Sequence, residues 1–221
     1  MFVIPCKYTN QSPIFDCVRS ISFFHPNEKI IVVDSHSDNT DYLNEILKIN
    51  NVIVLNEKNS NYEIGALWLA FNNFPEEHCY VLIHDSVILK QSLNDFIEND
   101  KTYNFLYFNE TIFNSEQNYL MEVLSKTDYI VSTNNLIGCA GSMMIIKNNI
   151  ISNMVSKKLS NYLLPTNKFE SQVCERILGL CLSLEGVNMV ENSIEGDGLS
   201  KGNEITNNLL LYIQKKHLIR Q

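Results

Sequence analysis

The sequence predicts an α/β fold in which a mostly parallel sheet is flanked by helices and the whole chain forms a single domain. Short apolar segments rich in strand-forming residues alternate with segments whose apolar residues recur at helical spacing. The 221 residues, of which 45% are hydrophobic, are enough to bury one large core. Strands that alternate with helices along a chain pair in parallel through right-handed crossovers, so we expect helices on the faces of this sheet.

The alternation is clearest in the first 90 residues. Strands are expected at residues 2–4, 29–33, 52–55 and 80–83. Helices are expected at residues 13–24, 40–49 and 62–74. We expect Ser12 to cap the first helix, because the proline that follows it suits the first helical position.

The second half of the chain is less regular. Its expected strands span residues 103–108, 129–131, 142–146 and 187–190. One or two helices are expected within 148–164, and others at residues 116–124, 165–184 and 205–218. Residues 195–202 are glycine-rich and polar, which is typical of a mobile loop. The single domain is thus expected to consist of residues 1–90 and a second half, residues 91–221, that ends in a helix.

Polar side chains follow three of the expected strands. Tyr8, Asp34 and Asp85 each come just after an apolar strand, and ligands of such sheets bind beyond the carboxyl ends of the strands. Asp85 lies between two apolar segments, where a carboxylate is costly to bury unless something pairs with it. A metal ion bound to a phosphate is one such partner. The simpler alternative is that Asp85 only caps a turn.

A second carboxylate is expected on the helix at residues 165–184. At 100° per residue, Glu170 falls among the apolar side chains of this helix, whereas Glu175 and Arg176 fall on the opposite, solvated side. A carboxylate on an apolar face must be paired, be protonated or lie at the rim of a site. Glu170 is therefore a candidate general base. The alternative is that it only binds Lys168 or a backbone amide.

The composition limits the classes of function. A net charge of −8, from 17 basic and 25 acidic residues, argues against a nucleic-acid-binding surface. The amino-terminal residues predict no signal peptide, and no segment predicts an integral membrane helix, so we expect a cytoplasmic protein. The cysteines form no CxxC pair, and we interpret them as small core residues in a reducing compartment: Cys6, Cys17, Cys79, Cys139, Cys174 and Cys181.

Four segments together resemble the nucleotide-binding half of GT-A glycosyltransferases. Residues 4–10, Ile-Pro-Cys-Lys-Tyr-Thr-Asn, are similar to the opening strand and IPxYN-type loop of that family, and residues 33–40 are similar to its VDDGSxDxT segment. The strand at 80–83 lies where the family has its DxD motif. The family's NxGxxxAxN helix is matched by Asn61, Gly65, Ala66 and Asn72. The match covers about the first two fifths of the chain.

The resemblance implies a GT-A-like (Rossmann-like) fold and transfer of a sugar from a nucleotide-diphosphate donor, UDP-sugar first of all, to a glycan or other hydroxyl acceptor. Asp34 would hold the nucleobase, with Tyr8 stacked on it, and Glu170 would be the acceptor-side acid. Mn²⁺ or Mg²⁺ would bind Asp85 and a histidine near the carboxyl terminus, His217; the alternative for His217 is a surface position. The expected donor-binding residues are Pro5, Lys7, Tyr8, Asp34, Ser35, Gly65, His84, Asp85, Ser86, Gly141 and Lys215.

The sequence departs from the family pattern at the DxD position. Only Asp85 remains there, and His84 or Ser86 replaces the second aspartate. This leaves open a catalytically inactive carbohydrate-binding or scaffold protein. The single-domain form is also similar to small glycosyltransferases of large DNA viruses, which implies the cytoplasm of a host cell. The sequence does not choose between inversion and retention at the anomeric carbon, nor does it fix the oligomeric state.

Two other nucleotide enzymes fit less well. A sugar-phosphate nucleotidylyltransferase needs a glycine- and arginine-rich first loop for a triphosphate, and residues 5–12 contain neither residue type. A dinucleotide-binding Rossmann domain needs a GxGxxG segment after the first strand, and none follows it.

Overall fold

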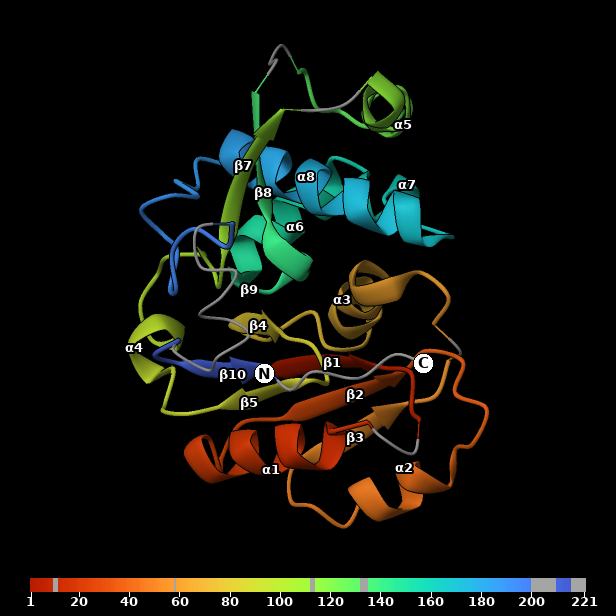
Figure 1. The fold of residues 1–221 in the computed structure, drawn as a ribbon, viewed down its shortest axis with the longest axis vertical. Coiled ribbons are helices and arrows are strands. Elements are labelled where there is room, and N and C mark those ends of the chain that lie inside the picture. The colour runs from red at the N-terminus through yellow and green to blue at the C-terminus, as the bar shows by residue number, and fades with distance from the viewer. Residues whose placement is uncertain (10–11, 58, 112–113, 132–134, 200–209, 216–221) are drawn as a thin grey trace.

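A six-stranded mixed sheet forms the centre of the computed structural model, which describes residues 1–9, 12–57, 59–111, 114–131, 135–199 and 210–215 (Figure 1). The strand order is β3-β2-β1-β4-β9-β6, with the first four strands parallel and the last two antiparallel to their neighbours. Their bounds are β1 Phe2–Cys6, β2 Ile30–Asp34, β3 Val52–Leu55, β4 Cys79–Leu82, β6 Tyr103–Asn104 and β9 Met144–Lys147. The predicted fold class is confirmed.

Helices cover both faces of this sheet (Figure 1). Alternate residues of a strand point to opposite faces, so Phe2 and Ile4 belong to one core and Val3 to the other. The first core is closed by α1 Ile14–Phe24 and α2 Asp41–Ile46. The second is closed by α3 Tyr62–Asn73, α6 Asn148–Ser156, α7 Leu159–Tyr162 and α8 Lys168–Leu184.

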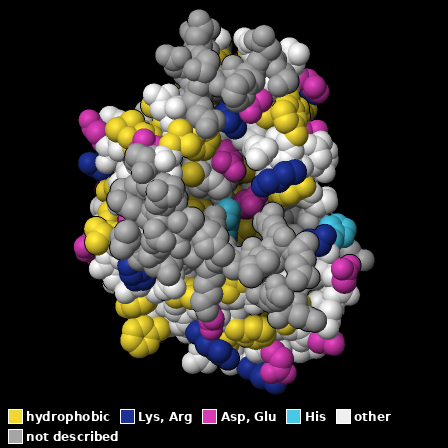
Figure 2. All heavy atoms as spheres, in the orientation of Figure 1, with side chains coloured by type: hydrophobic (Ala, Val, Ile, Leu, Met, Phe, Trp, Pro, Cys, Tyr) yellow, Lys and Arg dark blue, Asp and Glu magenta, His cyan; other side chains and the backbone are white. Residues whose placement is uncertain are grey.

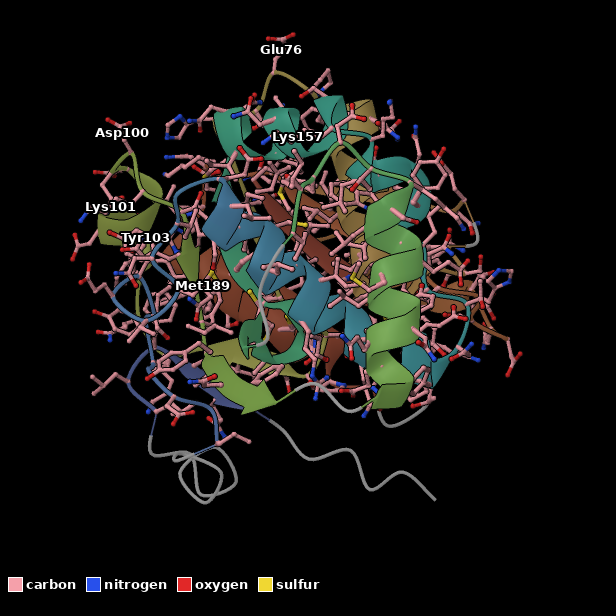
Figure 3. The ribbon with its side chains drawn as sticks, turned by 90° about the horizontal axis from the view of Figure 1, so that it is seen from above. Glu76, Asp100, Lys101, Tyr103, Lys157 and Met189 are labelled. Carbon is pink, nitrogen blue, oxygen red and sulfur yellow. The ribbon has the colours of Figure 1, made fainter. Side chains whose placement is uncertain are left out.

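The remaining elements form two small sheets and two further helices. A hairpin of β7 Tyr107–Thr111 and β8 Asn135–Cys139 extends beyond the main sheet, with α5 Asn114–Ser125 between its strands in the chain. Figure 3 shows α5 beside α8. The second small sheet pairs β5 Val87–Leu89 with β10 Ile213–Lys215, next to the short helix α4 Asn94–Ile97.

Three predicted elements are wrong in the second half. The expected strand at 103–108 is two strands, because β6 pairs with β9 whereas β7 pairs with β8. Residues 129–131 and 187–190 are not strands. Both segments are apolar, but they cover the core as turns and loops rather than pairing at a sheet edge.

The predicted terminal helix is also wrong in the part that the structure describes. Residues 213–215 form β10, antiparallel to β5. The backbone amides of Leu211, Tyr212 and Ile213 donate to the buried Glu195 carboxylate, which holds this segment extended. Residues 210–212 are not helical either, and the remaining residues of the predicted helix, 205–209 and 216–218, lie outside the described residues.

Candidate functional site

Three of the predicted donor residues lie at one edge of the sheet. Asp34 ends β2 and pairs in register with Cys6 at the end of β1, and Tyr8 follows two residues later. Strand β4 lies on the other side of β1, and Asp85 follows it. The carboxyl ends of these three parallel strands therefore bring Tyr8, Asp34 and Asp85 together, as the sequence predicts.

Asp34 is buried and hydrogen-bonded to its neighbours. Its side chain is 1% exposed, and it accepts hydrogen bonds from the Tyr42 hydroxyl at 2.9 Å and the Ser37 amide at 3.2 Å. The Tyr42 ring stacks on Tyr8, with ring centroids 4.4 Å apart and planes 7° apart. Asp34 thus fixes a two-ring stack at the sheet edge through Tyr42, a residue that is not among those predicted from the sequence.

Asp85 is half-buried beside the amino end of α1. It accepts a hydrogen bond at 3.0 Å from the Ser12 hydroxyl. Ser12 therefore does not cap α1, whose cap position is Pro13. The Cys6 thiol lies between Tyr42 and Asp85 and interacts with both side chains, and burial together with the Asp85 charge raises its pKa. The Asp34 and Asp85 positions are thus joined through one buried thiol.

The other predicted donor residues have different surroundings. Pro5 pairs with Val33 inside the sheet, and Lys7 is exposed. Ser86 is buried. The Ser35 hydroxyl accepts from the Asn59 amide at 3.2 Å. Gly65 packs so closely on Asn59 that a Cβ atom there would lie 2.2 Å from Oδ1, so glycine is required at this position for packing.

His84 and Gly141, which are far apart in sequence, are in direct contact. The His84 Nε2 atom lies 2.6 Å from the Gly141 carbonyl oxygen and 3.5 Å from a Glu63 carboxylate oxygen. A carbonyl oxygen only accepts, so Nε2 carries the proton. Gly141 has φ +64°, in the left-handed region, and lies in a 3-10 turn, Ala140–Ser142, that links β8 to β9. Figure 2 shows a hollow in the middle of one face where a histidine and acidic side chains are exposed.

Glu175, which the helical projection predicts to be solvated, lies beside Gly141. It is half-buried, and burial raises its pKa to about 7; the Glu63 charge adds to this shift, while a hydrogen bond from the Gly141 amide opposes it. The neighbouring Arg176 is buried and pairs with Glu116 of α5 at 3.5 Å. The prediction that Glu175 and Arg176 lie on a solvated face is wrong because the β7–β8 hairpin and α5 cover this part of α8.

Glu170 lies in the first turn of α8, whose cap residue is Asn167. Its carboxylate accepts from the Thr166 amide at 2.7 Å and the Thr166 hydroxyl at 2.9 Å, while its own amide donates to the Asn167 side chain. The hydrogen bond from the Thr166 amide lowers the pKa of Glu170. This matches the alternative in which Glu170 binds a backbone amide. A catalytic role for Glu170 stays a prediction.

The predicted metal ligands are only partly within the structure. Among the described residues, no group of three or more histidine, cysteine, aspartate or glutamate side chains is arranged to hold a metal ion. Asp85 offers one carboxylate, and Mg²⁺ and similar ions commonly bind one or two carboxylates together with substrate phosphates. The donor set thus fits an ion that is completed by a diphosphate. His217 and the Lys215 side chain lie outside the described residues.

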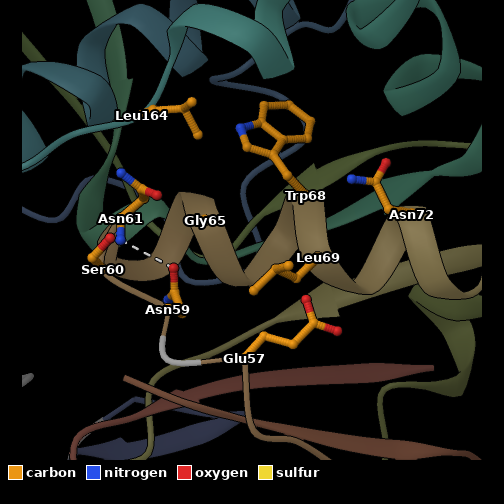
Figure 4. Close-up of a pocket in the computed structure, with 9 residues that line it drawn as sticks. All are labelled: Glu57, Asn59, Ser60, Asn61, Gly65, Trp68, Leu69, Asn72 and Leu164. Atoms are coloured by element: carbon orange, nitrogen blue, oxygen red, sulfur yellow. Dashed lines mark hydrogen bonds between the residues drawn. The ribbon is translucent and has the colours of Figure 1, made fainter. Parts of the chain in front are cut away.

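A separate hollow of about 260 Å³ lies against the outer side of α3 (Figure 4). At 100° per residue, the residues of α3 that line it point about half a turn away from Glu63, so this hollow is distinct from the contact between Glu63 and His84. It is lined by Glu57, Asn59, Ser60, Asn61, Gly65, Trp68, Leu69, Asn72 and Leu164.

Comparison with known proteins identifies similar folds but no similar sequence. No protein-family model matches the chain, and no curated protein matches it significantly. The glycosyltransferase GlyE of Streptococcus pneumoniae TIGR4 superposes with a TM-score of 0.53 at 12% identity, over 100% of this chain and 55% of GlyE. The chain has a GT-A-like fold.

Two further solved structures superpose less closely on this GT-A-like chain. TarS 1–349 of S. aureus has a TM-score of 0.48 at 12% identity, over 80% of this chain and 55% of TarS. The galactosyltransferase LgtC, with donor and acceptor sugar analogues, has a TM-score of 0.40 at 13% identity, over 81% of this chain and 69% of LgtC. The chain thus spans about half the length of GlyE and of TarS 1–349. Within the described residues, no helix is long and apolar enough to cross a membrane.

Proposed function

We propose that this protein is a glycosyltransferase that moves a sugar from a nucleotide-diphosphate donor, with UDP-sugar first among the candidates, to a hydroxyl group of a glycan or similar acceptor. The observation that supports this most is the gathering of Tyr8, Asp34 and Asp85 at the carboxyl edge of a GT-A-like sheet. In open α/β sheets this edge is where ligands bind.

The donor would lie along this edge. The nucleobase would stack on Tyr8, which Tyr42 and Asp34 hold in place. The diphosphate would reach Asp85, where Mn²⁺ or Mg²⁺ would be held by the carboxylate, with His217 as a further candidate ligand. The bound ion would neutralise the charge that develops on the leaving diphosphate. Ser12 orients the Asp85 carboxylate for this purpose through their 3.0 Å hydrogen bond.

On the acceptor side we propose Glu175 rather than Glu170 as the acid. The carboxylate of Glu170 is engaged by the Thr166 amide and hydroxyl, and the pKa of Glu170 is lowered. The pKa of Glu175 is about 7, which suits a group that accepts a proton near neutral pH. If the reaction inverts the anomeric carbon, Glu175 would deprotonate the acceptor hydroxyl; if it retains, Glu175 would position a sugar hydroxyl.

Calorimetric titration with UDP, with and without Mn²⁺, tests the donor site. We expect binding that requires Mn²⁺ and is lost in Asp85→Ala. The matched control is Asp95→Ala, which removes an exposed aspartate from α4. UDP binding that is the same without Mn²⁺ and in Asp85→Ala would keep the donor site but show that the metal assignment is wrong. If UDP, GDP and dTDP all fail to bind, the donor site is refuted, and the result supports the alternative of a catalytically inactive carbohydrate-binding or scaffold protein.

A further inference from the structure

We propose that His84, one of the two residues that flank Asp85 at the position of the related motif, is a positioning residue that holds the Glu175 carboxylate in place through the peptide group of Gly141. This inference rests on the proposed glycosyl transfer for its catalytic meaning. The contacts themselves, however, can be tested without any substrate.

The first link joins the end of β4 to the 3-10 turn. The His84 Nε2 atom donates to the Gly141 carbonyl oxygen at 2.6 Å, and Glu63 of α3 approaches the same nitrogen at 3.5 Å. The His84 side chain is 18% exposed, so water competes only weakly for these contacts. Because Nε2 is occupied as a donor, it has no lone pair to offer a metal ion. The imidazole therefore fixes a loop rather than replacing the missing aspartate at Nε2.

The second link is the glycine itself. A Cβ atom on Gly141 would lie 2.6 Å from the His84 ring carbon Cε1, and its φ of +64° disfavours any side chain. The imidazole thus packs directly against the Gly141 backbone. The carbonyl of Gly141 accepts from His84, while its amide donates toward Glu175. Gly141 therefore connects the side chains of His84 and Glu175, which are 91 residues apart in the sequence.

The third link fixes α8 above this turn. A Cβ atom on Gly179 would lie 2.1 Å from the Ile137 carbonyl oxygen and 2.8 Å from the Gly138 Cα atom, so the helix backbone touches β8 at this point. Glu175 lies one turn earlier on the same side of α8, roughly 6 Å along the helix axis. This displacement places Glu175 over the turn that follows β8, where Gly141 lies.

The three links have one consequence for the reaction. His84 directly precedes Asp85, so the strand end that would hold the donor diphosphate also sets the position of the acceptor-side acid. A misplacement of about 1 Å in such an arrangement can lower a rate by about 100-fold. Loss of His84 is therefore expected to lower kcat without weakening nucleotide binding.

A glycine-selective ¹⁵N spectrum tests the contacts without substrate. The chain has eight glycines, so few amide peaks are expected, and Gly141→Ala identifies the relevant one by its loss. We expect the Gly141 amide proton to resonate downfield and to move upfield in both Glu175→Gln and His84→Ala. His84→Gln, whose amide nitrogen can replace Nε2 as donor, should keep the downfield position. A Gly141 peak that His84→Ala leaves in place would overturn the proposal.

Steady-state kinetics tests the catalytic consequence. We expect His84→Ala to lower kcat by about 10- to 100-fold while the donor KM changes less than twofold, and His84→Gln to restore most of kcat. An equal loss in both variants, or a rise in the donor KM alone, would refute a positioning role. If the wild-type protein transfers no sugar, the proposed function fails, while the spectrum still decides whether His84 positions Glu175.

Discussion

The donor edge and the contact between His84, Gly141 and Glu175 lie side by side, but they are built in different ways. The donor edge consists of residues that directly follow parallel strands, so the fold alone brings Tyr8, Asp34 and Asp85 together. The second group requires three segments to meet: the end of β4, the turn after β8 and the middle of α8. A site at strand ends depends on strand order, whereas a site made by a turn and a helix depends on how the whole second half packs.

The strongest test of the donor edge is Asp85→Ala. If this carboxylate holds the ion that stabilises the leaving diphosphate, its loss removes several kcal/mol of transition-state stabilisation, or about a 1,000-fold drop in transfer rate. The measurement is transfer from UDP-sugar with Mn²⁺. A Ser12→Ala variant, which removes only the 3.0 Å hydrogen bond, should lose much less activity. Equal losses of transfer activity in Asp85→Ala and Ser12→Ala would contradict the proposal that Asp85 holds the ion.

The acid on α8 can be tested by comparing two glutamine variants. Glu175→Gln should lower kcat by about 100- to 10,000-fold, as expected for loss of a general base. In the wild-type protein the rate should rise with pH through about 7, because Glu175 must lose its proton to act, and this rise should vanish in the variant. If Glu170→Gln gives the larger loss and abolishes the pH dependence, the acid is Glu170 instead.

Glu175→Gln should also change stability in a pH-dependent way. The folded-state pKa of about 7 exceeds the ordinary value of 4.5, so the contribution of this group to stability is complete below 4.5 and is lost as pH rises through 7. At pH 8 the glutamine variant should therefore be the more stable protein, by at most about 3 kcal/mol. Thermal melts of the wild-type protein and of Glu175→Gln at pH 5 and pH 8 measure this effect. A stability difference between the two proteins that is the same at both pH values would contradict the prediction.

The smallest expected effect is at the cap of α8. Glu170→Gln removes the charged acceptor of the Thr166 amide and should cost about 1 kcal/mol of folding stability at neutral pH. Because the folded-state pKa of Glu170 is lowered, its contribution is present above 4.5 and is lost as pH falls through the folded value. Thermal melts should show that the wild-type protein is more stable than Glu170→Gln at pH 7 but not at pH 3.

The same contrast explains what could be predicted from the sequence. The inner strands β1, β2 and β4 are buried almost throughout on both faces, so each reads as a continuous apolar segment, and the polar residues after them mark the sheet edge. The wrong assignments lie where tertiary contacts decide the outcome. Residues 213–215 form a strand because β5 has an edge that can pair with them and because Glu195 accepts from the amides of residues 211–213 where the strand begins; neither contact is encoded locally.

Glu170 and Glu175 of α8 show why the candidate site could be predicted only in part from the sequence. A helical projection assumes one buried face, but α8 is covered on a second side by the β7–β8 hairpin and α5, so Arg176 is buried. Glu170 in turn lies in the first helical turn, where a cap is a common role for a glutamate. Gly141 is among the expected donor-binding residues, so the sequence does indicate this part of the site, but nothing in the sequence pairs Gly141 with Glu175.

The buried cysteines give this protein six internal reporters of local opening. All six are free and buried, and burial raises the pKa of each thiol, so alkylating reagents should reach them only when the surrounding structure opens. Cys6, Cys17 and Cys79 lie in the core beneath one face of the sheet, and Cys139, Cys174 and Cys181 lie in the core beneath the other. Counting labelled peptides over time would therefore show which side of the sheet opens first, without any introduced probe.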